Sequence, residues 1–212
     1  MPIALWAMVA GSLAAGPVML VAAERATGTV LVAPGSTRRA VAAVMSVSTT
    51  ALCCAGWLKF GTTLDWVAWC WACALACGLV LTDLTCRRLP FRLVVTLAGG
   101  VGLVLLGATL ACGGWNRFGV ACTAAVHVGV PVVLVQMWVP EHTGGGDTAL
   151  YAALALYLGW FGWDGLLRGL LIATGLTALV ALAVAVWSRS MNSQFAAGPS
   201  LLAGALASIL LA

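Results

Sequence analysis

The stretch Thr143-Gly-Gly-Gly-Asp-Thr-Ala-Leu150 places one carboxylate, that of Asp147, between three glycines and a long apolar run. An ionisable residue at the edge of a membrane helix is costly to keep there, so it is a candidate for function. Glycines let a chain turn sharply and let another segment approach closely, which a simple helix cap does not require. The stretch therefore predicts a membrane helix that begins beside a functional aspartate.

The composition excludes a soluble domain. The chain has 212 residues, of which 63% are hydrophobic and 8% charged, and its mean hydropathy is +1.09. Soluble domains carry about 25% charged residues. Apolar runs fall at 2–23, 40–58, 66–82, 93–111, 118–139, 148–163, 169–187 and 195–212. We therefore predict a single domain, residues 1–212, that forms an all-α polytopic bundle of about eight transmembrane helices in the lipid bilayer.

Cysteine and histidine give no sign of a metal or cofactor site. Nearly all of the eight cysteines lie inside apolar runs, where thiols pack as small hydrophobic groups, and a metal or redox role is the alternative. The sequence has no His-Glu-x-x-His motif and no paired Cys-x-x-Cys outside the apolar runs. His127 and His142 stand in no recognisable pairing with a serine or cysteine nucleophile. We expect no metal, no cofactor and, despite a net charge of +4, no nucleic-acid partner.

The distribution of basic residues predicts the orientation. With eight helices, the odd-to-even connections hold seven arginines, at positions 25, 38, 39, 87, 88, 92 and 189. The other connections hold only Lys59, Arg117 and Arg168. Because basic loops stay in the cytoplasm, we expect a multi-pass protein of the inner (plasma) membrane with both termini outside. Asp65 and Asp164 then fall outside as ordinary loop charges.

A second stretch, Asp83-Leu-Thr-Cys-Arg-Arg-Leu-Pro90, ends another apolar run on the same predicted cytoplasmic side as Asp147. We therefore expect Asp83 and Asp147 to meet. Two carboxylates around one water share a proton, so one activates the water and the other donates to an amide carbonyl. This is general acid–base peptide hydrolysis without a covalent intermediate.

Other interpretations of these residues stay open. Asp147 at a helix start can serve as an N-cap, and Asp83 can form an interfacial ion pair with Arg87 or Arg88. An aspartate pair in a membrane can also relay protons in an ion-coupled transporter. Transporters often contain an internal repeat, and none is evident in this sequence.

Three segments carry a resemblance to a known family. Asp83-Leu-x-x-x-Arg88-Leu89-Pro90 and Gly144-Gly-Gly-Asp147-x-x-Leu150 resemble the active-site motifs of the type IV prepilin peptidases, membrane aspartic proteases of the Gly-x-Gly-Asp class. Phe195-Ala-Ala-Gly198-Pro199-Ser-Leu201 is similar to the Gly-Pro motif that opens the last helix of that family. The resemblance implies that Asp83 and Asp147 are the catalytic pair. It also implies a prepilin or pseudopilin substrate, cut at the cytoplasmic face after its short basic leader and before its hydrophobic segment.

The sequence departs from the family in two places. The family usually has a lysine two residues after its second aspartate, where this chain has Ala149, so an inactive relative that only binds pilins is a further alternative. Full-length relatives carry a zinc-binding methyltransferase segment between the first two helices, where this chain has only residues 24–39 without cysteine. It therefore resembles the short, peptidase-only branch, often associated with tight-adherence pili and secretion, and we expect no N-methyltransferase activity.

Further residues are expected to contact the substrate. Gly144, Gly145 and Gly146 are predicted to form a flexible loop that pairs with the extended leader. His142 flanks this loop, and Gly198 and Pro199 open the last helix on the same side.

Overall fold

The computed structural model describes residues 2–87, 89–138, 145–188 and 196–211. Within these ranges side chains are described except those of residues 2–10, 12, 13 and 188. The described residues form eight helices and no other regular element, which confirms the predicted all-α bundle. In chain order they are α1 (Pro2–Thr27), α2 (Ser36–Phe60), α3 (Leu64–Cys86), α4 (Phe91–Cys112), α5 (Trp115–Trp138), α6 (Gly145–Gly159), α7 (Gly162–Ser188) and α8 (Gly198–Leu211).

Five of the described helices, α2, α3, α4, α5 and α7, are long and apolar enough to cross a membrane. The helices α6 and α8 are shorter, with 15 and 14 residues. The expected run 148–163 contains a turn, because α6 occupies Gly145–Gly159, and α7 begins at Gly162, seven residues before the expected start at 169. Apolar character continues through this turn, so hydropathy alone does not reveal it.

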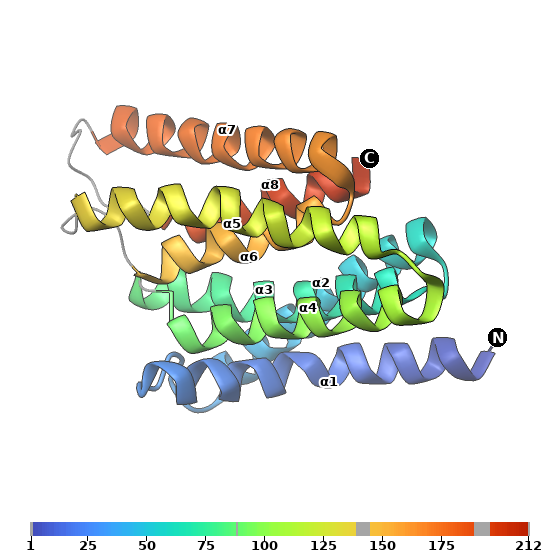
Figure 1. Ribbon diagram of the computed structural model, residues 1–212. Helices are drawn as coiled ribbons and strands as arrows, with labels where there is room; N and C mark the ends of the chain where they lie inside the picture. The colour runs from blue at the N-terminus through green and yellow to red at the C-terminus, as the bar shows by residue number, and fades with distance from the viewer. Residues whose placement is uncertain (1, 88, 139–144, 189–195, 212) are drawn as a thin grey trace.

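The helices run back and forth, so the connections gather at two ends of the bundle (Figure 1). We call the end where α3 leads into α4 the Asp83 end, and the end where α6 leads into α7 the Trp160 end. The first helix begins and the last helix finishes at the Trp160 end (Figure 1). Both candidate aspartates lie at the Asp83 end. Asp83 is in the last turn of α3, and Asp147 is in the first turn of α6.

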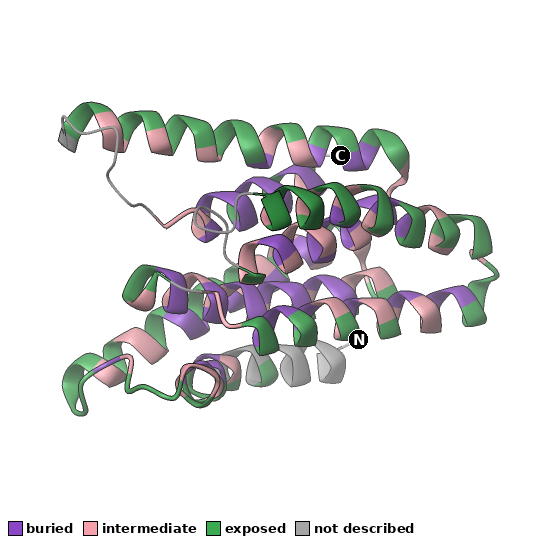
Figure 2. Cartoon of the chain, turned by 60° about the vertical axis from the view of Figure 1, so that its left-hand side comes forward, coloured by how far each residue is buried: buried purple, intermediate pink, exposed green. Residues whose placement is uncertain are grey.

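The most buried of the five long helices is α3, and the least buried is α7 (Figure 2). Small residues bring neighbouring helices close together. Gly16 of α1 lies against Ala42 of α2, and Gly204 of α8 lies against the backbone of Ala173 in α7. Close backbone approach replaces the hydrophobic driving force that is missing between helices in lipid.

Aromatic side chains join the helices at the Trp160 end. The Trp160 indole N–H donates to Asp65 Oδ1 over 2.9 Å, and the Arg117 guanidinium lies 5.5 Å from the centroid of the Trp160 ring. Phe60 packs against Trp69 with ring centroids 6.1 Å apart. The interpretation of Asp65 as an ordinary loop charge is therefore wrong, because it begins α3 and holds a tryptophan of another connection.

The helix α7 extends past its neighbour α8 at the Asp83 end. The hydroxyls of Thr177 and Ser200 are 2.9 Å apart, so these two residues lie at the same level. Because α8 begins at Gly198 and α7 continues to Ser188, about 16 Å of α7 lies beyond this level. The exposed side chains on that extension are apolar, and they include Leu182, Val186 and Trp187.

Candidate functional site

Asp83 is the buried carboxylate of the site. It lies in the last turn of α3 and is only 5% exposed. Its Oδ2 accepts a hydrogen bond from the backbone N–H of Gly198, over 2.8 Å, although 115 positions separate the two residues. A buried carboxylate requires such a partner, because an unsatisfied charge in an apolar setting is strongly unfavourable. The first predicted motif is thus in direct contact with the third.

The turn after Asp83 has an unusual backbone. Arg87 caps α3 in the left-handed conformation, with φ 49° and ψ 37°, and its N–H donates to Asp83 O over 2.9 Å. It is the one described residue other than glycine with positive φ. The contact between these two described residues is made by the backbone, and their side chains form no ion pair. The turn directs the chain to Leu89 and Pro90, where α4 begins.

Gly198 and Pro199 are the first two residues of α8. Proline suits the first turn of a helix, where its missing N–H has no intrahelical acceptor, and the expected helix opening is confirmed. Gly198 is required for a different reason. A Cβ at this position would lie 2.8 Å from Asp83 Oδ2 and 3.4 Å from Leu89 Cδ2, so the carboxylate would have to move.

Gly146 brings the second motif to the same place. A Cβ at Gly146 would overlap the carbonyl oxygen of Leu89 and lie 2.8 Å from Leu89 Cβ. The same leucine also lies beside Gly198, which contacts Asp83. Leu89 therefore stands between the glycines of two predicted motifs, and the segments around Asp83, Gly146 and Gly198 converge around it.

The glycine stretch itself differs from the expected flexible loop. Gly145 and Gly146 are the first two residues of α6, and Asp147 is the third. Asp147 is partly exposed and lies inside the first turn rather than at the N-cap. A carboxylate there faces the positive end of the helix dipole, which stabilises it. His142 and Gly144 lie outside the described residues.

A recess opens beside the site at the Asp83 end. It has a volume of about 590 Å³ and is lined by Thr27 and Thr29, by Cys86, and by Leu89 and Pro90. Leu89, which lies between Gly146 and Gly198, therefore borders open space. A polypeptide or water can approach the turn after Asp83 from this side.

Several other candidates have structural partners. His127 Nδ1 lies 2.8 Å from the Thr123 carbonyl oxygen, and its ring packs edge-on against Trp163. Arg38 forms an ion pair with Glu24 at 2.6 Å. In the part of the chain that the structure describes, no group of three or more His, Cys, Asp or Glu side chains could hold a metal ion.

Sequence reasoning missed two contributors. Leu89 belongs to the Asp83 motif, but nothing in its side chain shows that its carbonyl oxygen packs on Gly146. The left-handed Arg87 is equally hidden, since glycine or asparagine is the usual signal for that conformation. No family model, curated protein or solved structure matches this chain.

Proposed function

We propose that this protein is a membrane-embedded aspartic endopeptidase of the prepilin peptidase type. Its substrate would be a prepilin-like protein with a short basic leader followed by a hydrophobic segment. Asp83 and Asp147 would activate one water and cleave the peptide bond between the two parts. The support comes from the three family-like segments of the sequence and from the geometry of the Asp83 end.

One observation carries the proposal. Asp83 Oδ2 accepts the backbone N–H of Gly198, and Leu89 lies between Gly198 and Gly146. Segments that are distant in sequence thus converge where a two-aspartate site would need them. A structural capping aspartate explains neither the glycine required at 198 nor the glycine that accommodates Leu89.

The proposed chemistry requires one carboxylate to be protonated while the other is ionised. A pair around one water holds one proton between them, and that proton belongs to the pair rather than to one residue. The ionised partner takes a proton from water, and the protonated partner donates to the substrate carbonyl. Gly198 N–H would keep Asp83 in a fixed orientation during both steps.

The basic residues favour a cytoplasmic Asp83 end. Seven arginines belong to the connections and helix ends on that side, although Arg88 and Arg189 lie outside the described residues. The Trp160 end has Lys59, Arg117 and Arg168. The positive-inside rule then puts the proposed catalytic site at the cytoplasmic face of the plasma membrane.

The connection between α1 and α2 supports a peptidase without a methyltransferase segment. Half of the expected loop 24–39 is helical, since α1 continues to Thr27 and α2 begins at Ser36. Arg38 of α2 forms an ion pair with Glu24 of α1 across this short connection. We therefore propose leader cleavage as the activity, without N-methylation.

The test is processing of a co-expressed prepilin-like reporter by the wild type and three matched variants. Asp83→Asn and Asp147→Asn should each abolish cleavage, because each removes an essential carboxylate. Asp164→Asn is the control, since Asp164 is exposed in the first turn of α7, at the Trp160 end. Cleavage retained in either of the first two variants contradicts the two-aspartate mechanism. Proton-coupled transport without cleavage would favour the transporter alternative.

A further inference from the structure

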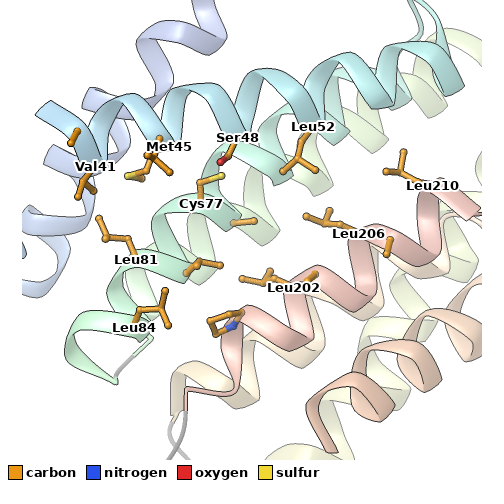
Figure 3. Close-up of a pocket in the computed structure, with 17 residues that line it drawn as sticks. Val41, Met45, Ser48, Leu52, Cys77, Leu81, Leu84, Leu202, Leu206 and Leu210 are labelled. Atoms are coloured by element: carbon orange, nitrogen blue, oxygen red, sulfur yellow. The ribbon is translucent and has the colours of Figure 1, made fainter. Parts of the chain in front are cut away.

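An apolar groove runs along the outside of the bundle between α2, α3 and α8 (Figure 3). Its volume is about 630 Å³. Its walls include Met45 and Leu52 of α2, Leu81 of α3, and Leu202 and Leu206 of α8. Ser48 contributes the one hydroxyl among the lining residues, so the groove suits an apolar occupant.

The groove begins at the candidate site. Leu84 and Pro199 line it, and they directly follow Asp83 and Gly198, the two residues joined by the hydrogen bond. At the other end Lys59 Nζ donates to the Leu210 carbonyl oxygen over 3.2 Å and links α2 to α8. Figure 3 shows α2 and α8 lying closer together at Leu52 and Leu210 than at Val41 and Leu202. The wide end of the groove is therefore next to Asp83.

The length of the groove and the small side chains on its α8 wall suit a helix. The lining of α8 runs from Pro199 to Leu210, which is about 17 Å, or about three helical turns. Ala203 and Ala207 are exposed on this wall, one turn apart. Small side chains at that spacing let a second helix backbone approach closely.

We propose that this groove holds the hydrophobic helix of the substrate, in the part that directly follows the cleaved bond. The proposal depends on the proposed function, because it assigns a docking place to the same substrate. A segment that continues from a peptide bond at Asp83 into the membrane needs an apolar path that starts there. Among the described cavities, this groove borders both Leu84 and Pro199.

Site-specific photo-crosslinking tests occupancy without requiring cleavage. A photoreactive residue replaces Ala203 or Ala207, and Ala178 is the matched control, since it is an exposed alanine on α7 outside the groove lining. The probe is a labelled peptide with a basic leader and about 20 apolar residues, reconstituted with the protein in vesicles. We expect adducts from positions 203 and 207 several times more often than from 178. Equal labelling at all three positions, or adducts with lipid alone, would overturn the proposal.

A cleavage assay separates the groove from the catalytic proposal. Ala203→Trp and Ala207→Trp fill the groove from an exposed position and leave the buried face of α8 intact. They should lower kcat/KM about tenfold or more for the long peptide, because binding of the remote segment contributes to the rate. A short soluble peptide that ends a few residues after the leader should be cut at the wild-type rate. If both peptides lose cleavage equally, the groove proposal is wrong. If the wild type cuts neither peptide but crosslinks from 203 and 207, the peptidase proposal fails and the docking site stands.

Discussion

The helix α3 carries an aspartate in its first turn and another in its last turn, and the two are held by different means. Asp65 accepts a hydrogen bond from the indole side chain of Trp160. Asp83 is held by a backbone N–H, that of Gly198, in a position that excludes any side chain at 198. Asp65 thus binds a side chain, whereas Asp83 binds the backbone of a residue that has no room for a side chain.

The surroundings extend this difference. At the Trp160 end the connections contain Gly61, Gly113 and Gly162 with positive φ. The ring of Phe60 packs there against the rings of Trp69 and Phe161. At the Asp83 end Gly28 and Gly35 also have positive φ, but Arg87 takes the left-handed conformation without being glycine, which adopts it more easily. Unfavourable backbone geometry of this kind gathers at sites of function. The Trp160 end is thus joined by aromatic packing, whereas the proposed site lies beside the left-handed turn at Arg87.

Among changes that keep both carboxylates, Gly198→Ala should have the largest effect. The new methyl group would displace the Asp83 carboxylate, and a shift of about 1 Å at a reacting group costs about hundredfold in rate. We expect reporter processing to fall by that factor while the protein stays in the membrane. Gly99→Ala in α4 is the control, since nothing lies within 4 Å of its Cβ position. Equal processing by both variants would contradict the role given to Gly198.

The neighbouring glycines of α6 give a sharper comparison. Gly146→Ala should reduce processing about tenfold or more, because its methyl group meets the backbone of Leu89 and moves Asp147 with the helix start. Gly145→Ala should stay within about twofold, since its nearest neighbour there is Gln136 Nε2 at 3.5 Å. The measurement is processing per folded molecule. A flexible loop without close contacts would tolerate both changes alike.

The smallest effect on processing should come from the Trp160 end. Trp160→Phe removes the indole N–H that donates to Asp65 and puts a smaller ring in place of the indole near Arg117. We expect a loss of about 1–2 kcal/mol in the free energy of unfolding, seen as a lower Tm in detergent. Cleavage by the folded protein should be unchanged. A loss of processing at unchanged Tm would contradict the expectation that Trp160 affects stability and not cleavage.

The sequence predicts the helices well because apolar runs of membrane length have few alternative structures. Their ends are less predictable. The run expected at 148–163 contains the turn between α6 and α7, and only Gly162 with φ 88° marks it structurally. The assignment of Asp65 to a loop failed because its partner, Trp160, is 95 positions away. Hydropathy does not encode pairing between helix ends.

The candidate site shows the same limit. Motif spacing puts Asp83, Gly146 and Gly198 at one end of the bundle, and the structure adds the contacts among them. The glycines were expected to provide freedom of movement, whereas Gly146 provides room for Leu89. Composition cannot distinguish these two uses of glycine. The groove beside α8 was also invisible, because lipid-facing and groove-facing alanines look alike in a sequence.

The extension of α7 beyond α8 has a consequence for the shape of the bilayer. Apolar side chains on α7 continue to Trp187, which is 92% exposed, whereas Arg87 and Arg92 flank the turn after α3. In a bilayer, α7 and α3 would therefore match different hydrocarbon thicknesses on the same side of the membrane. Lipid adapts to such a mismatch by local thinning. We infer that the headgroup surface would dip toward Asp83 beside α3 and rise along α7. Such a slope would bring bulk water closer to the buried carboxylate of Asp83.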